Sequence, residues 1–112
     1  MHFLQKGVLS VEIKQAVMVG TLESSDILIS IMPNPGKGLE IHLQSVVKTQ
    51  YGDAILATMN EVLESFGITD AIVEATDRGA LDWVIRSRMQ TACCRATESK
   101  FNWKEEDKNA EG

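Results

Sequence analysis

The side chains most often used for nucleophilic, acid–base or metal chemistry are sparse in this chain and poorly spaced for it. His2 and His42 are the only histidines, and no cysteine or second histidine lies within metal-ligand spacing of His42. Cys93 and Cys94 are adjacent and fall toward the end of an expected helix, where neither a helix N-terminus nor a neighbouring base would activate a thiol. We therefore expect surface histidines, cysteines that serve packing, and no metal site.

The carboxylates and glycines form no catalytic or phosphate-binding pattern either. Asp70 and Asp77 stand where turns or helix caps are expected, whereas Glu74 lies on the opposite face of a strand from Val73. The glycines make neither a GxGxxG nor a Walker spacing. Taken by itself, this set of residues predicts no catalytic residue.

One run of small and polar residues remains as a candidate site. It has the sequence GTLESSD at residues 20–26, and Ser24 and Ser25 stand there between two apolar segments. Because Ser and Asp are common in turns, composition alone favours an ordinary polar hairpin turn. Ser24 has no histidine or lysine nearby in the sequence that would remove its proton, so we do not expect it to attack a substrate by itself.

Length and charge limit the class of protein. The 112 residues fit one domain, and 44% apolar with 24% charged residues is typical of a folded globule. The formal net charge is −5 without any dense run of Lys or Arg, which argues against nucleic acid and favours basic surfaces on protein partners.

Export and membrane insertion are not indicated. No stretch approaches the roughly 18 apolar residues that span a bilayer, and the first residues lack the apolar core of a secretion signal. The adjacent cysteines hardly permit a mutual disulfide. We expect a soluble protein of the cytoplasm with no membrane partner.

Hydrophobic periodicity predicts the elements that must position the serine run. Strands are expected over residues 16–22, 27–32, 39–44 and 70–75. Apolar residues at three- and four-residue steps predict one helix from a Ser45 cap to Phe66, and a second, capped by Asp77 or Thr76, that fades near Ala96. The order βββαβα predicts an α+β fold, a two-layer sandwich of a mostly antiparallel sheet with two helices on one face.

Three separated motifs make the chain resemble a known family. They are AVMVGTLESSD at residues 16–26, QYGDAI at residues 50–55, and DRGALD at residues 77–82 leading into Arg86-Ser87-Arg88. In this order, and over residues 13–103, the chain resembles the acyl carrier protein of citrate lyase, the gamma subunit of that enzyme. The resemblance implies a carrier that is not itself an enzyme.

The same resemblance implies a covalent cofactor on Ser24. Members of the family carry 2'-(5''-phosphoribosyl)-3'-dephospho-CoA on this serine through a phosphodiester bond, and Ser25 is the neighbouring alternative. Members often have glycine after the modified serine, so the hydroxyl of Ser25 is a departure from the pattern. Glu23 and Asp26 are interpreted either as turn residues or as contacts for the attaching enzyme, and Arg86 and Arg88 either as solvated residues or as contacts for the phosphates.

The resemblance also implies partners and a division of the chain. The expected partners are the prosthetic-group transferase, the citrate lyase alpha subunit as acyl transferase and the beta subunit as citryl lyase, with acetyl and citryl thioesters held during cleavage of citrate to oxaloacetate and acetate. Residues 1–12 are expected to be a flexible extension, 13–96 the acyl carrier domain and 97–112 a mostly disordered polar tail. Because the stretch before Ile13 is longer than in the family, we hypothesise that the native start lies at residues 11–15.

Two other interpretations stay open. One is the acyl carrier of malonate decarboxylase, which uses the same kind of prosthetic group, although the motif at residues 77–82 favours citrate lyase. The other is an interaction module with no covalent group. A helical phosphopantetheine carrier is disfavoured, because here the serine lies between expected strands.

Overall fold

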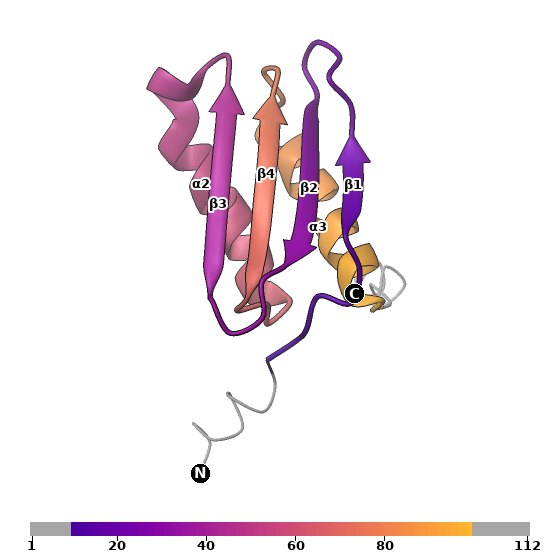
Figure 1. The fold of residues 1–112 in the computed structure, drawn as a ribbon. Helices are drawn as coiled ribbons and strands as arrows, with labels where there is room; N and C mark the ends of the chain where they lie inside the picture. Colours follow the sequence, from indigo (N-terminus) through magenta and orange to yellow (C-terminus); the bar gives the residue numbers. More distant parts are fainter. Residues whose placement is uncertain (1–9, 100–112) are drawn as a thin grey trace, which may run out of the picture.

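A computed structural model of the chain describes residues 10–99, which form four strands and two helices (Figure 1). In chain order these are β1 (Val17–Gly20), β2 (Ile27–Pro33), β3 (Leu39–Ser45), α2 (Lys48–Ser65), β4 (Ala71–Asp77) and α3 (Asp82–Thr97). The predicted order βββαβα is confirmed. The expected extension at 1–12 and tail at 97–112 fall mostly outside the described residues.

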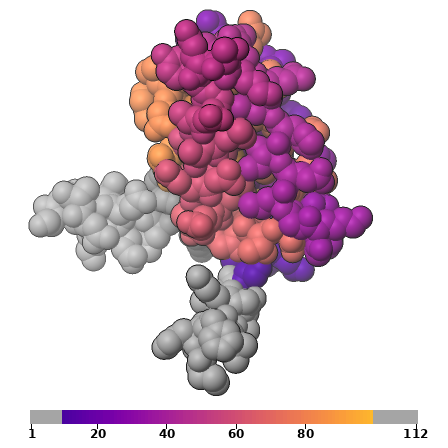
Figure 2. All heavy atoms as spheres, turned by 90° about the vertical axis from the view of Figure 1, so that its left-hand side faces the viewer, coloured from indigo at the N-terminus to yellow at the C-terminus, as the bar shows by residue number. Residues whose placement is uncertain are grey.

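The four strands form one mixed sheet in the order β1-β2-β4-β3. β1 pairs with β2 and β2 with β4 in antiparallel fashion, whereas β3 and β4 are parallel. Both helices cover the same face of this sheet (Figure 1), and Figure 2, seen from the β3 edge, shows α2 lying along the sheet beside β3. The predicted α+β sandwich, with a mostly antiparallel sheet, is therefore confirmed.

The core lies between the sheet and the two helices. Ile27, Ile29 and Ile31 of β2 have no exposed surface, because their period-two spacing turns all three toward the helices. Met59 of α2 and Met89 of α3 are equally buried from the helical side. On the edge strand β3 burial is less complete, since Leu43 is buried but Leu39 is 40% exposed.

The first strand is shorter than predicted, because a backbone turn interrupts it. Residues 16–22 were expected to be extended, but β1 ends at Gly20, whose φ of 98° leaves the strand conformation. Leu22 is consequently an exposed loop residue and not part of the sheet.

The predicted starts of both helices are also wrong, because the proposed caps have other partners. Ser45 ends β3, three residues before α2 begins, and its hydroxyl donates to Asp77 Oδ2 (2.7 Å) and accepts from the Val47 N–H (3.0 Å). Asp77 ends β4, and its Oδ1 accepts from the Ala80 N–H (3.0 Å), so that it stabilises the loop before α3. Thr76 lies within β4.

The beginning of the described region runs beside the connection between α2 and β4. The Val11 N–H donates to the Gly67 carbonyl (2.9 Å), and Val11 forms a parallel bridge with Ile68. Ile13 is buried in the core. The chain thus packs against the body of the fold four residues before β1.

Candidate functional site

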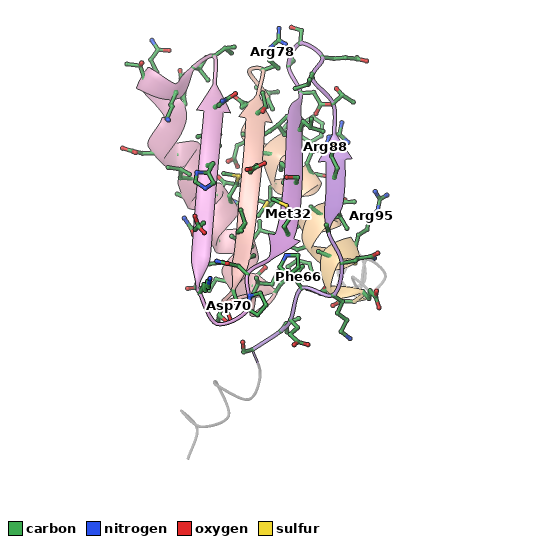
Figure 3. All side chains as sticks on the ribbon, in the orientation of Figure 1. Met32, Phe66, Asp70, Arg78, Arg88 and Arg95 are labelled. Atoms are coloured by element: carbon green, nitrogen blue, oxygen red, sulfur yellow. The ribbon has the colours of Figure 1, made fainter. Side chains whose placement is uncertain are left out.

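The serine run forms the loop between β1 and β2, at one end of the sheet. The β3–α2 and β4–α3 connections lie at the same end (Figure 1). Figure 3 shows Arg78 at this end, whereas Asp70 lies at the opposite one. Two motifs that are about fifty residues apart in the sequence, at 20–26 and 77–82, are therefore neighbours in space.

Gly20 opens the loop where no other residue fits. Its φ is 98°, and a β-carbon built on it would lie 1.9 Å from the Ile27 carbonyl oxygen. Both the backbone conformation and the close approach of β2 require glycine here. The first residue of the GTLESSD run is thus explained by the tight start of the loop.

Ser24 and Ser25 are the central residues of a four-residue turn within the loop. The Asp26 N–H donates to the Glu23 carbonyl (3.1 Å), which closes the turn from Glu23 to Asp26. Ser25 has a φ of 66°, and Ser24 has a negative φ. This sign pattern is that of a type II turn, whose third position favours glycine. The glycine that the family often has after the serine therefore suits this backbone, and Ser25 adopts it at some cost in strain.

Asp26 anchors the loop to the body of the protein. Its carboxylate accepts hydrogen bonds from Thr21 Oγ1 (2.7 Å) and the Ile27 N–H (2.8 Å). Arg88 of α3 binds it through Nε and Nη2, at 3.0 and 3.1 Å, in the fork-like geometry typical of strong arginine–carboxylate pairs. The Arg88 hydrogen bonds, followed by those from Thr21 and Ile27, lower the pKa of Asp26 from 3.8 to about 2.

Arg78, in the β4–α3 loop, holds the other side of the serine turn. Its carbonyl accepts from the Ser25 N–H and its N–H donates to the Asp26 carbonyl, both at 2.9 Å. Its guanidinium donates to the Leu22 carbonyl (3.1 Å). Backbone and side chain of one residue thus fix three positions of the loop.

The Ser24 side chain itself is exposed. Residues 21–25 are all exposed, and within residues 10–99 no hydrogen bond engages the Ser24 or Ser25 hydroxyl. No histidine or lysine of that region bonds to the loop, and the two arginines that do cannot act as bases. The site therefore presents a hydroxyl on a rigid turn without a means of activating it, which suits modification by another enzyme.

The other candidate residues serve structural roles. Cys93 is fully buried, and burial raises the pKa of its thiol to about 12, so that packing is confirmed for it. His42 is an exposed residue of β3, 3.6 Å from Glu40, on the edge of the sheet opposite β1. Asp70 accepts from the Gly38 N–H (2.8 Å) and supports a loop, as expected.

The structure gives the intramolecular partners of the four charged neighbours of the serine run. Asp26 is a buried turn residue, and it pairs with Arg88, whose side chain is 41% exposed. Arg86 is 3.0 Å from Glu61 of α2, on the surface. Glu23 is exposed and accepts the turn's hydrogen bond through its carbonyl.

Sequence reasoning missed the arginines that fix the loop. Arg78 was quoted only as part of a motif, and the Asp26–Arg88 pair joins residues 62 positions apart. The sequence signal available for this contact was that the motifs at residues 20–26 and 77–82 occur together. In the structure they form a single hydrogen-bond network. Within the described region no group of three or more metal-ligating side chains occurs, and neither helix is long and apolar enough to cross a bilayer.

Comparisons with known proteins identify a family and a fold that this chain resembles. A family model described as the malonate decarboxylase delta subunit (MdcD) acyl carrier matches residues 14–96. The crystal structure of a Pseudomonas malonate decarboxylase hetero-tetramer in complex with malonate contains a chain with the same fold, at a TM-score of 0.68 over 78% of this chain and 89% of that one. At 17% identity, this likeness shows the fold alone.

Similarity in sequence is much closer to another group of carriers. The citrate lyase acyl carrier protein of Clostridium perfringens is 42% identical over 93 residues, which is 82% of this chain and 92% of that protein. The one from Lactobacillus helveticus is 48% identical over 89 residues, covering 80% and 91%, and the one from Streptococcus equi subsp. zooepidemicus 44% over 97 residues, covering 86% and 95%. The chain therefore belongs to the family of citrate lyase acyl carrier proteins.

Proposed function

We propose that the Ser24 oxygen is the attachment point of 2'-(5''-phosphoribosyl)-3'-dephospho-CoA, joined through a phosphodiester bond. A covalent prosthetic group is what an acyl carrier requires, and the family resemblance implies this particular one. The observation that carries the proposal is the exposed, unbonded Ser24 hydroxyl at the tip of a loop that is fixed on both sides. Ser25 is equally exposed, and we prefer Ser24 because its spacing from residues 20–23 matches the family motif.

The charges around the loop fit a phosphodiester. Attachment would put one negative charge beside Ser24, and the Arg78 guanidinium reaches this loop from the β4–α3 connection to donate to the Leu22 carbonyl. The negative charge of Asp26 is already neutralised by Arg88. An added anion would therefore meet the Arg78 cation and no free carboxylate of Asp26, so that the exposed Glu23 is the remaining negative charge of the turn.

The role of this chain in the reaction is to hold and present the group. When bound, the group supplies a thiol on which the alpha subunit would exchange acetyl for citryl, and from which the beta subunit would release oxaloacetate and leave acetyl behind. Tethering raises the effective concentration of the acyl group at two active sites. The rigid turn fixes the base of the tether, and the acidic chain suits basic partner surfaces in a multi-subunit complex. We assign this work to the cytoplasm, where free thiols such as those of Cys93 and Cys94 persist.

Malonate decarboxylase is the second candidate system. The matching family model and the solved structure favour it by name, but citrate lyase carriers match in sequence at 42–48% identity over more than nine-tenths of their length. Reconstitution separates the two. The matured chain added to citrate lyase alpha and beta subunits should restore citrate cleavage, and restoration only of malonate decarboxylation by that enzyme's other subunits would reject the citrate assignment.

Intact mass tests the attachment. The chain is produced together with the prosthetic-group transferase and its precursor-forming enzyme, and the mass of the purified protein is measured. The wild type should carry one discrete adduct, and Ser24→Ala should carry none. Ser25→Gly should carry a full adduct, because glycine suits the positive φ at this position. A bare wild-type mass would instead favour an unmodified interaction module, and an adduct kept by Ser24→Ala would move the site to another residue.

A further inference from the structure

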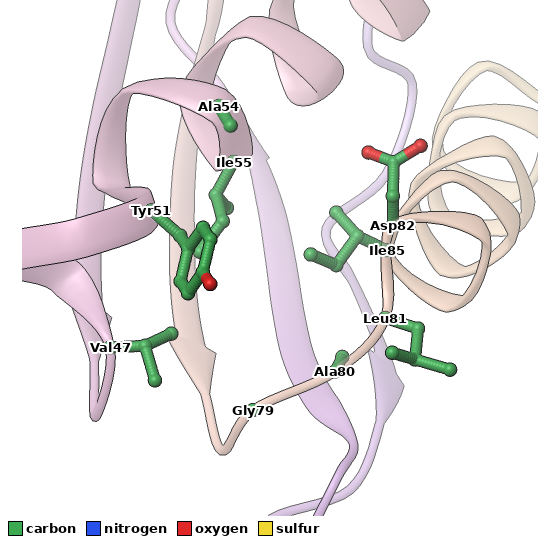
Figure 4. A pocket seen from close by; sticks show the side chains of 9 residues that line it. All are labelled: Val47, Tyr51, Ala54, Ile55, Gly79, Ala80, Leu81, Asp82 and Ile85. Carbon is green, nitrogen blue, oxygen red and sulfur yellow. The ribbon is translucent and has the colours of Figure 1, made fainter.

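A pocket of about 410 Å³ opens beside the serine loop, between the starts of the two helices. On one side it is lined by Val47, Tyr51, Ala54 and Ile55, and on the other by residues 79–82 and Ile85. Figure 4 shows the Tyr51 ring and the Ile85 side chain on opposite sides of this space. We call it the α2–α3 pocket. Residues of both the QYGDAI and the DRGALD motif line this pocket. The serine loop alone does not explain why both motifs are present.

The lining selects against anions. It contains no Lys, Arg or His, and its one ionised side chain is the carboxylate of Asp82. That carboxylate accepts from Thr58 Oγ1 (2.6 Å) and has Arg86 3.9 Å away, outside the lining. A phosphate or a citryl carboxylate would therefore meet like charge, whereas a neutral aromatic ring with N–H donors would meet apolar walls, a tyrosine ring and a hydrogen-bond acceptor.

The pocket is also close to the proposed attachment point. The Ser25 N–H donates to the Arg78 carbonyl (2.9 Å), and Gly79, the next residue, lines the pocket. Two Cα–Cα steps of about 3.8 Å and one hydrogen-bonded crossing of about 5.5 Å limit the Ser24-to-Gly79 Cα separation to about 13 Å. In a phosphoribosyl-dephospho-CoA group, one phosphate and two sugars separate the serine oxygen from the adenine. Adenine is thus the neutral aromatic part nearest to the pocket.

We propose that the α2–α3 pocket holds the adenine ring of the attached group, against Tyr51 and with Asp82 accepting from the exocyclic amine. This inference rests on the proposed modification of Ser24. Adenine held there would fix the base of the group and leave its diphosphate and thiol-bearing portion outside, because the lining disfavours anions. Tyr51, which is 56% exposed in the bare protein, would then be covered.

Nuclear magnetic resonance of the unmodified and modified full chain tests this inference. Intact mass first establishes that the group is attached, so that failure of modification is distinguished from failure of docking. In the modified protein we expect cross-relaxation between the adenine protons and the Tyr51 ring and Ala80 methyl, with amide shifts at the pocket in addition to those of the modified serine loop. Tyr51→Ala should abolish these cross-peaks, Tyr51→Phe should keep them, and Trp83→Ala, an exposed neighbour outside the lining, should leave them unchanged.

Two results would overturn the inference. The first is an adduct confirmed by mass whose adenine resonances match those of free dephospho-CoA in position and width. The second is a pocket whose amide signals respond only when the alpha or beta subunit is added, because this would identify the occupant as an apolar side chain of a partner. The exposed Leu81 in the lining and Trp83 beside it make that second result a physically distinct alternative.

Discussion

The serine turn shows how a single residue can be kept in an unfavourable conformation. Ser25 has a φ of 66°, which an L-residue with a β-carbon adopts at a cost of about 1 kcal/mol or more. Three hydrogen bonds around the turn, from Asp26 to Glu23, from Ser25 to Arg78 and from Arg78 to Asp26, hold this backbone in place. The strain is local and lies beside the hydroxyl that is proposed to be modified.

Ser25→Gly should therefore stabilise the protein. Glycine removes the steric cost of the positive φ but adds chain entropy to the unfolded state, so the free energy of unfolding should rise by about 0.5–1 kcal/mol. Urea denaturation of the unmodified chain measures this difference. Ser24→Gly is the matched control, since Ser24 has a negative φ and glycine there should lower stability slightly. Equal effects of the two variants would contradict the strain at Ser25.

The Asp26–Arg88 pair makes the stability of the loop depend on pH. The pKa of Asp26 is lowered from 3.8 to about 2, first of all by Arg88. Between these values the unfolded chain binds more protons, so the contribution of this group is complete above about pH 4 and is lost as the pH falls toward about 2. Because the Asp26 side chain is only 13% exposed, the contribution can reach about 2 kcal/mol.

Arg88→Met should remove most of this dependence. We expect the difference in unfolding free energy between wild type and variant to shrink as the pH is lowered from about 5 to about 2.5, measured by urea denaturation at each pH. Arg86→Met is the control, because the Arg86–Glu61 pair is exposed and contributes less than about 1 kcal/mol. A wild-type-to-Arg88→Met difference that stayed constant over this range would exclude Asp26 as the titrating group.

At the scale of elements, the β1–β2 loop depends on how closely two backbones approach. Gly20 lies directly against the Ile27 carbonyl, and the loop that follows is fixed to the β4–α3 connection through Arg78. Ser45 and Asp77 join the ends of the neighbouring strands β3 and β4 by a hydrogen bond of 2.7 Å. Three connections at one end of the sheet therefore form a single, mutually supported surface.

Gly20→Ala should destabilise the protein far more than the same change in another loop. The added methyl group would collide with the Ile27 carbonyl at an unfavourable φ, and we expect a loss of more than about 2 kcal/mol. Gly36→Ala has a comparable φ of 74° with open space around the new carbon, and should cost only about 1 kcal/mol. Thermal or urea unfolding of both variants gives the comparison. Similar losses would mean that backbone strain, and not the clash, governs Gly20.

At the scale of the whole molecule, one face of the sheet is covered and the other is open. Figure 1 shows both helices behind the same face. Ile29 of β2 points into this core, whereas Met18 of the adjacent β1 is 66% exposed on the open face. Hydrophobic stabilisation therefore comes from a single layer between sheet and helices.

Truncation of side chains on the two faces should reveal this asymmetry. Ile29→Ala would leave a cavity in the core, and we expect a loss of about 2–5 kcal/mol. Met18→Ala removes an exposed side chain and should change stability by about 0.5 kcal/mol or less. Urea denaturation of both variants checks the prediction. A large loss for Met18→Ala would indicate that the open face is covered in solution, for example by a second copy of the chain.

The sequence by itself determined the elements and their order. Alternation in β2 and the three- and four-residue steps in both helices are local patterns, and they reflect which side of each element meets the core. The same reasoning identified residues 23–26 as the turn between the first two strands, because they favour turns, although it assigned residues 20–22 to the first strand. The position of Ser24 in the chain was thus available without a structure.

Only the tertiary structure decided how these elements meet. β4 enters the sheet between β2 and β3, which brings the DRGALD motif to the serine loop and lets Arg88 reach Asp26. The helix starts were mispredicted for the same reason, since Ser45 and Asp77 bind each other across neighbouring strands. Such contacts depend on the relative placement of segments far apart in the chain, whereas periodicity records only the burial of each segment along its own axis.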